Sequence, residues 1–156
     1  MIIRPVNESE LVDVIRLQDS VYPVSHQEPI NTFESMLRVY PQGSLVAVDQ
    51  GIIGYLFFHP GLMDEVQSLC SELKLPLNPD CMYLHDLVVS HECRGLGVSD
   101  SLLQACYITS LSEGFNELRL VAVYGAESFW QRIGFVGLEW IDYGGEKALR
   151  MSKSLN

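Results

Sequence analysis

The sequence has few basic residues for its length. Ten Lys and Arg stand against 20 Asp and Glu, so the formal net charge of the 156-residue chain is −10. Nucleic acids are bound through clustered Lys and Arg, so this balance disfavours a nucleic-acid partner. The negative charge is compatible with a cationic substrate such as an amine or a basic peptide, although solubility alone accounts for most of the acids.

Long hydrophobic runs and paired cysteine motifs are also missing. No apolar run approaches membrane-spanning length, and no basic segment followed by an apolar core opens the chain, so we expect neither membrane association nor a secretory signal. The four cysteines are Cys70, Cys81, Cys93 and Cys106, and they lack the spacing of a metal site. We therefore expect free thiols, a cytoplasmic location and no bound metal.

The remaining composition is that of an ordinary globular protein. Hydrophobic residues make up 47% of the chain, which excludes a disordered protein, and 156 residues are enough to bury a core. Segments of strand and helix periodicity follow one another, which predicts an α/β fold in a single domain over residues 1–156.

The apolar periodicity also predicts the individual elements. Expected strands are residues 2–5, 84–89, 118–123, 135–142 and 148–153, with a hairpin over residues 44–58 that turns at Asp49–Gly51. Expected helices are residues 11–18, 31–40, 98–109 and 126–133. Residues 61–81 carry a further short helical pattern that ends at Pro76, which predicts a helix that is either peripheral or placed over the substrate.

The stretch from Met82 to Ser99 is the most informative part of the chain. A buried strand runs into the loop Arg94-Gly-Leu-Gly97, and apolar residues then recur at helical spacing from Val98 onward. A strand that feeds a Gly-containing loop at a helix N-terminus presents free N–H groups and the positive end of the helix dipole. Because glycine lets a ligand approach the backbone closely, this arrangement predicts a phosphate site.

Two common phosphate-loop patterns, the P-loop and the dinucleotide-binding fingerprint, do not match this segment. No Lys-Ser or Lys-Thr follows the glycines, and Asp100 stands where a dinucleotide fingerprint needs its third Gly. A lone G-x-G is also compatible with simple turn residues. With Arg94 before it and the small Ser99 after it, however, the string resembles the coenzyme A pyrophosphate loop, [QR]-x-x-G-x-[GA], of the GNAT superfamily of N-acetyltransferases.

A second motif strengthens this resemblance. Residues 126–135 are similar to the next motif of the family, A-x-x-[FL]-[YW]-x-x-x-G-F, and they follow the strand expected at residues 118–123. Two motifs in the right order are more specific than either alone. The resemblance extends over essentially the whole chain and is weakest at residues 21–30 and 61–81.

The resemblance implies a GNAT fold, which is a mixed, largely antiparallel central sheet flanked by helices with a splayed strand pair that holds acyl-CoA. It implies transfer of acetyl from acetyl-CoA to a small amine or a peptide amine by direct attack, and it is compatible with a homodimer. The cofactor-binding residues that it implies are Leu87, Val88 and Val89 on the strand, Arg94, Gly95, Leu96, Gly97, Val98 and Ser99 in the loop, and Trp130 beside the pantetheine arm.

The catalytic residues are less clearly indicated. Many relatives carry a carboxylate base on the strand before the loop, where this chain has His85 and Asp86, which we expect to face opposite sides of the sheet. His85 titrates near neutral pH and is a reasonable base, although a structural histidine is an equally open interpretation. Trp130 occupies the position of a frequent Tyr acid, so Tyr124, Tyr143 or water is left as the proton donor.

Two classes of function therefore remain open. The first is an amine N-acetyltransferase, which His85, Asp86 and the complete set of fold elements favour. The second is a non-catalytic acyl-CoA-binding sensor, which the absence of a tyrosine at Trp130 favours.

Overall fold

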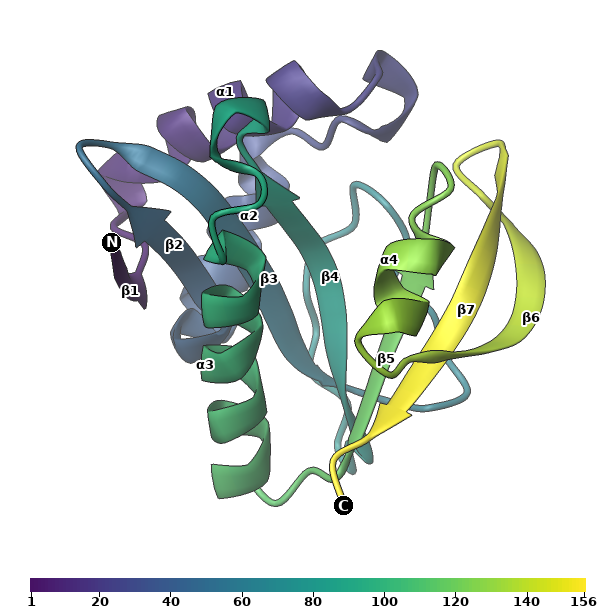
Figure 1. Ribbon diagram of the computed structural model, residues 1–156. Helices are drawn as coiled ribbons and strands as arrows, with labels where there is room; N and C mark the ends of the chain where they lie inside the picture. Colours follow the sequence, from purple (N-terminus) through teal and green to yellow (C-terminus); the bar gives the residue numbers. More distant parts are fainter.

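Seven strands form one mixed sheet in the computed structural model, which describes residues 1–156 (Figure 1). Their order is β1-β2-β3-β4-β5-β7-β6, and every neighbouring pair is antiparallel except β4 and β5. The strands are β1 (Ile2–Pro5), β2 (Ser44–Val48), β3 (Ile52–Gly61), β4 (Cys81–Val89), β5 (Glu117–Ala122), β6 (Val136–Tyr143) and β7 (Glu146–Ser154). The sheet expected from the GNAT resemblance is confirmed.

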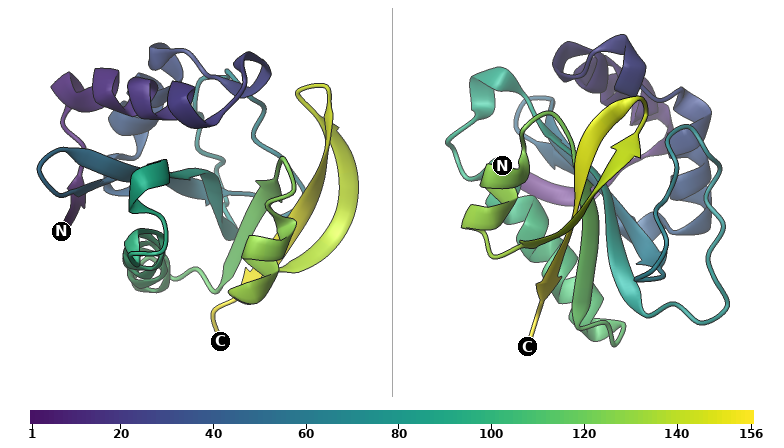
Figure 2. Two further views of the ribbon diagram at one scale, coloured as in Figure 1. Left: turned by 45° about the horizontal axis from the view of Figure 1, so that its top comes forward. Right: turned by 90° about the vertical axis from the view of Figure 1, so that its right-hand side faces the viewer.

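Four α-helices cover the two faces of the sheet. They are α1 (Leu11–Val21), α2 (Ile30–Val39), α3 (Val98–Ser112) and α4 (Glu127–Arg132). Helices α1 and α2 lie on one face, and α3 and α4 lie on the other (Figure 2). Each corresponds to an expected helix, with α2 beginning one residue early and α3 running three residues longer. A short 3-10 turn, η2 (Val24–His26), lies in the connection between α1 and α2.

The helix expected within residues 61–81 is absent, and that expectation was wrong. No helix or strand forms between Gly61 and Cys81. Distant side chains bond the main chain there in place of helical partners: the Glu28 carboxylate accepts from Cys70 N–H at 2.8 Å. Cys70 also has a left-handed φ of 62°, which interrupts any helix. The apolar residues of this connection therefore pack one by one, and Leu73 reaches the core.

The core brings α3 close to the sheet beneath the phosphate loop. A Cβ at Gly54 of β3 would lie 3.0 Å from Val98 Cγ1 and 3.1 Å from the Val88 carbonyl oxygen, so a larger residue there would displace the first turn of α3. Val98 and Leu102 are fully enclosed. The start of α3, and with it the preceding loop, is fixed by this contact.

The parallel pairing between β4 and β5 is short. Only three residue pairs join the strands, and the last of them is Leu84 with Leu120. Beyond this point β4 continues to Val89 and β5 to Ala122, and the two strands diverge (Figure 1). This is the splayed pair that the resemblance implies.

A β-bulge in β4 corrects the expected orientation of His85 and Asp86. Phe57 pairs with Asp86 but Phe58 pairs with Leu84, so His85 is an extra residue that no residue of β3 opposes. The Asp86 carboxylate accepts from the Tyr55 hydroxyl, and the His85 ring lies 6.4 Å from that of His59. Tyr55 and His59 share one face of β3. Both His85 and Asp86 therefore face the side covered by α1 and α2.

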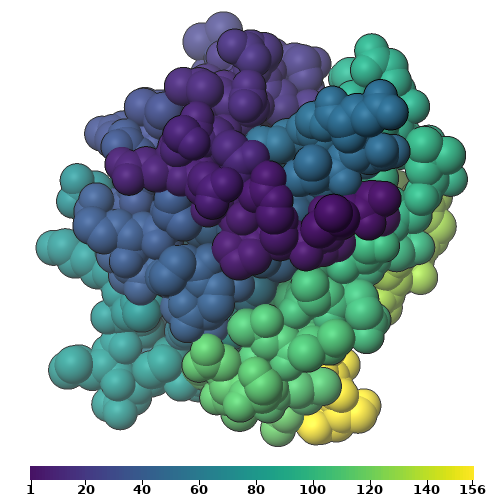
Figure 3. All heavy atoms as spheres, turned by 90° about the vertical axis from the view of Figure 1, so that its left-hand side faces the viewer, coloured from purple at the N-terminus to yellow at the C-terminus, as the bar shows by residue number.

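None of the helices is both long and apolar enough to cross a bilayer. Viewed from the side of β1, the surface consists mainly of the N-terminal half and α3, with the C-terminal residues at its lower edge (Figure 3).

Candidate active site

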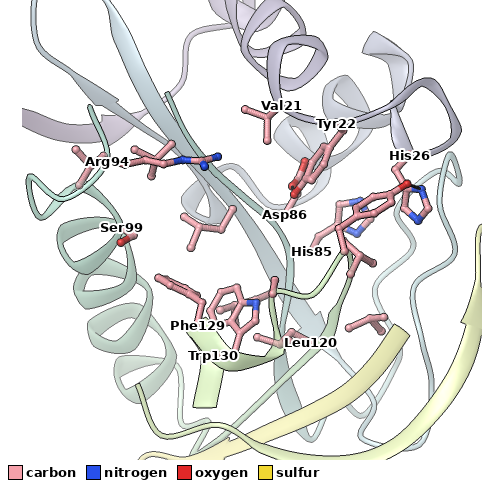
Figure 4. Close-up of a pocket in the computed structure, with 18 of the residues that line it drawn as sticks. Val21, Tyr22, His26, His85, Asp86, Arg94, Ser99, Leu120, Phe129 and Trp130 are labelled. Carbon is pink, nitrogen blue, oxygen red and sulfur yellow. Dashed lines mark hydrogen bonds between the residues drawn. The ribbon is translucent and has the colours of Figure 1, made fainter. Parts of the chain in front are cut away.

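A cavity of about 740 Å³ lies between the diverging ends of β4 and β5. It runs from the start of α3 to the connection between α1 and α2 (Figure 4). We call its two ends the loop end, formed by Arg94, Gly95, Gly97, Val98, Ser99 and Asp100, and the far end, formed by Tyr22, His26, Glu28, His85, Asp86, Tyr124 and Tyr143. Its size falls within the range of about 300–1,000 Å³ that is usual for small-molecule sites.

The loop end has the backbone geometry of an anion site. Gly95 and Gly97 adopt left-handed φ values of 79° and 81°, and a Cβ at either position would meet no atom within 4 Å. A side chain there would project into open space at the cavity. The N–H groups of Val98 and Ser99 at the start of α3 donate no hydrogen bond to any acceptor of the chain. These free donors and the helix dipole favour a bound phosphate.

Two charged side chains modify the loop end in opposite directions. Arg94 forms no ion pair within the chain and lines the cavity, so its guanidinium is available to an anion. Asp100, in the first turn of α3, also lines the cavity. Its carboxylate stabilises the helix N-terminus but repels an anion bound there.

The middle of the cavity is apolar. Leu87 and Val89 of β4 line it, whereas Val88 is 3% exposed and its side chain lies in the core. Trp130 also lines the cavity, and its ring packs edge-on against Phe129 and Phe135 at centroid distances of 5.0 and 5.2 Å. Leu96 is outside the lining and 71% exposed. Of the residues that the resemblance assigns to the cofactor, only Val88 and Leu96 do not line the cavity.

A buried ion pair dominates the far end. His85 Nε2 lies 2.7 Å from Glu28 Oε1, and both side chains are almost fully enclosed. Burial alone would lower the pKa of His85, but the charge and hydrogen bond of Glu28 outweigh it and hold that pKa above its ordinary value. The same attraction overcomes burial at Glu28 and lowers its pKa. Because a carboxylate only accepts, Nε2 carries a proton, and Nδ1 of His85 has no partner within the chain.

Glu28 is held in place by bonds from both sides. The buried Gln18 side chain of α1 accepts from Glu28 N–H at 2.8 Å and donates to its C=O at 3.0 Å. Cys70 N–H bonds the second carboxylate oxygen at 2.8 Å. The carboxylate therefore has a fixed orientation toward His85.

Asp86 is the second buried acid of the far end. Its two oxygens accept hydrogen bonds from the Tyr22 hydroxyl at 2.8 Å and the Tyr55 hydroxyl at 2.7 Å. Burial raises the pKa of the Asp86 carboxyl to about 6, although the charge of His85 and the Tyr55 hydroxyl both favour its ionised form. Asp86 therefore changes protonation state close to neutral pH.

Two tyrosines complete the far end. The Tyr124 hydroxyl bonds Ser25 Oγ at 3.0 Å and also His26 Nδ1, so it links the β5–α4 connection to η2. The Tyr143 hydroxyl donates its proton in a hydrogen bond to Gln67 C=O at 2.9 Å, so this proton is already engaged within the chain. Of these two expected proton donors, Tyr124 keeps the more adaptable hydroxyl, because its residue is 45% exposed.

The sequence indicated some of these residues and not others. His85, Asp86 and Tyr124 were expected at the site and all line its far end. Glu28, Tyr22 and His26 were not foreseen, because they lie where the family resemblance is weakest. Glu28 is 57 residues from His85 in the sequence, and no local sequence pattern predicts their pairing. Nowhere do three or more His, Cys, Asp or Glu residues form a group that could hold a metal ion.

The sequence matches the model of the acetyltransferase (GNAT) family over residues 11–135, which is most of the chain. The chain belongs to this family. The loop end lies where GNAT proteins carry the motif that the sequence resembles, and the splayed pair lies directly before it. No curated protein matches the sequence.

Solved GNAT structures share the fold across nearly the whole chain. GphF, a GNAT-like decarboxylase in complex with isobutyryl-CoA, aligns with a TM-score of 0.85 and 16% identity over 100% of both chains. Ard1 from Thermoplasma volcanium aligns with a TM-score of 0.79 and 16% identity over 99% of this chain and 97% of its own. The NatC complex bound to Gag peptide and CoA aligns with a TM-score of 0.76 and 19% identity over 99% of this chain and 98% of its own. At these identities the likeness establishes the fold.

Proposed function

We propose that this GNAT protein transfers acetyl from acetyl-CoA to a primary amine by direct attack. The observation that carries the proposal is a single cavity that joins a phosphate-type loop at one end to a cluster of buried titratable groups at the other. Structures of the same fold hold isobutyryl-CoA or CoA.

The cofactor would lie along the cavity from the loop end toward the far end. The N–H groups between Arg94 and Ser99 would hold the pyrophosphate, with the Arg94 guanidinium adding charge. The free edge of β4, at Leu87–Val89, would form β-like contacts with the pantetheine amides. Trp130 would pack beside that arm, and the thioester would then reach the far end.

The reaction needs a base at the far end, because only a neutral amine can attack. Asp86, whose pKa is about 6, is ionised at neutral pH and is the better acceptor for the amine proton. His85, whose pKa is raised by the charge and hydrogen bond of Glu28, would instead stabilise the developing oxyanion. This division favours Asp86 over His85 as the base.

The proposed bond changes follow from these roles. The amine nitrogen attacks the thioester carbon, forming the C–N bond, and its proton passes to Asp86. The tetrahedral intermediate then collapses, the C–S bond breaks, and the thiolate takes a proton from Tyr124 or from water. Trp130 cannot supply that proton, since an indole N–H is a hydrogen-bond donor only.

The second candidate function is a non-catalytic acyl-CoA sensor. The observation that favours it is the indole at Trp130, which leaves no phenol on α4. A sensor and an acetyltransferase share the loop end and differ only in whether the far end performs chemistry.

The experiment combines acetyl-CoA binding by calorimetry with thiol release in the presence of an amine panel. We expect both binding and amine-dependent thiol release. Binding without release by any amine would support the sensor. Gly97→Asp should lower acetyl-CoA affinity at least about 100-fold, since charge-assisted hydrogen bonds of about 1.5–3 kcal/mol each are lost and a negative charge is added.

Gly114→Asp is the matched control for this variant. Gly114, just after α3, also has a positive φ (87°) and open space around its Cβ position, but it does not line the cavity. Equal losses of affinity in the two variants would contradict the assignment of the loop.

A further inference from the structure

Four connections of the chain meet over the far end of the cavity, and we infer from this enclosure that the acceptor is a small monoamine with an apolar body. The inference rests on the proposed function and narrows its substrate. It excludes peptides, polyamines and amino acids as good acceptors.

Hydrogen bonds join the four connections to one another. Tyr124, between β5 and α4, bonds Ser25 and His26, between α1 and α2. Cys70 N–H, between β3 and β4, bonds Glu28 after η2 at 2.8 Å. The same β3–β4 connection accepts a hydrogen bond from Tyr143, at the turn between β6 and β7.

Packing closes the remaining gap at the β6–β7 turn. A Cβ at Gly144 would lie 2.8 Å from Leu69 Cδ1 and 3.3 Å from His26 Nε2, so the turn rests directly on both side chains. A polypeptide that entered the far end would have to part these contacts. A small amine could enter beside Tyr124, the 45% exposed member of this enclosure, and would displace only the hydrogen bonds of its hydroxyl.

The cavity also sets an upper limit on size. Its whole volume of about 740 Å³ is that of a site for one drug-sized ligand. The pantetheine arm of acetyl-CoA would fill much of it. The space left beside Asp86 and His85 suits an acceptor of a few heavy atoms.

The charges of the far end match one ammonium and no carboxylate. Glu28 is paired with His85, whereas Asp86 is bonded only by tyrosine hydroxyls and is the one acid of the far end without a basic partner. A second ammonium would be buried without a partner, which is costly. The two arginines of the lining, Arg94 and Arg132, lie in the phosphate loop and on α4. The far end therefore has no arginine that could pair with a carboxylate of the acceptor.

The walls of the far end suit an apolar body next to an ammonium. The rings of Tyr22 and His26 lie 6.4 and 4.5 Å from that of Tyr124, and Tyr143 is 6.4 Å from His26. Aromatic faces attract a cation and pack against hydrocarbon.

Matched acceptors test the inference on the wild-type protein with acetyl-CoA. Butylamine is compared with 1,4-diaminobutane, and 2-phenylethylamine is compared with phenylalanine and with phenylalanylglycine. We expect kcat/KM for each monoamine to exceed that of its charged or extended partner at least about 30-fold, since an unpaired buried charge or polar group costs a few kcal/mol. Equal or better use of the diamine, the amino acid or the dipeptide would overturn the inference.

A wall variant tests the enclosure itself. Leu69→Ala should narrow the gap in kcat/KM between 2-phenylethylamine and phenylalanylglycine by about tenfold, because the β6–β7 turn loses its contact. Leu77→Ala is the control, since Leu77 lies in the same connection but is 98% exposed. An unchanged ratio in Leu69→Ala would count against the enclosure.

The two possible failures are distinguishable. Acetyl-CoA binding without thiol release by any acceptor would refute the proposed function, and the inference with it. Thiol release with the dipeptide and none with monoamines would preserve the acetyltransferase and refute the small acceptor alone.

Discussion

The loop end and the far end of the cavity are built in different ways. The loop end comes from one short segment of the chain, residues 94–100, whose conformation follows from two glycines and a helix start. The far end gathers side chains from Tyr22 to Tyr143, which only the complete fold brings together. A contiguous site can be recognised in a sequence, whereas an assembled one depends on contacts that the sequence does not display. The two ends should therefore respond differently to substitution.

Asp86→Asn should have the largest effect at the far end and leave the loop end intact. We expect turnover to fall about 10²–10⁴-fold, the usual contribution of a positioned base, with acetyl-CoA affinity unchanged. Wild-type turnover should rise with pH through about 6, as the Asp86 carboxyl loses its proton, and the variant should lack this rise. Asp64→Asn, at an exposed residue of the β3–β4 connection, is the control. A parallel loss of affinity in Asp86→Asn would show that the two ends are not separable.

The same variant has a signature in stability. The folded pKa of Asp86, about 6, lies above its ordinary value of 3.8, so protonated Asp86 favours folding at pH below about 4. That contribution is lost as pH rises through about 6. The free energy of unfolding of wild type relative to Asp86→Asn should thus fall by up to about 3 kcal/mol between pH 4 and 7, as measured by urea unfolding. A difference that does not vary with pH would mean that Asp86 titrates normally.

Gln18→Leu tests whether the far end depends on long-range support. Glu28 would lose both hydrogen bonds to its main chain, which should cost about 1–3 kcal/mol of stability and lower turnover more than acetyl-CoA affinity. Gln104→Leu makes the same change on the exposed side of α3. Rescue by Gln18→Glu at low pH, where a protonated carboxyl can both donate and accept, would separate positioning from mere destabilisation.

The elements of the fold were largely predictable, because each is specified by its own periodicity and turn residues. The hairpin turn at Gln50 and Gly51, with φ values of 56° and 139°, is an example. The bulge at His85 was not predictable, since it is defined by the register of β3 against β4 rather than by β4 alone. The helix expected within residues 61–81 failed for a similar reason: its main-chain groups bond to Glu28 and Ser35, which lie far away in the sequence.

Asp100→Asn should have the smallest effect and belongs to the loop end. Removal of a carboxylate from the anion-binding end of α3 should raise acetyl-CoA affinity about two- to fivefold at low ionic strength, with less gain at high salt. Asp13→Asn, in the first turn of α1 and outside the cavity, controls for the loss of helix stabilisation. No gain, or an equal gain in both variants, would place the bound pyrophosphate away from Asp100.

The short ladder between β4 and β5 also determines how a bound ligand would affect stability. The ladder between the two half-sheets, β1–β4 and β5–β7, has only three residue pairs and ends at Leu84 and Leu120. A ligand bound between the open strand ends would contact both half-sheets, because residues of β4 and of β5 line the cavity. At 100 times its dissociation constant such a ligand adds about 2.7 kcal/mol to the free energy of unfolding. Amide hydrogen exchange should then slow in both half-sheets together when the ligand is bound.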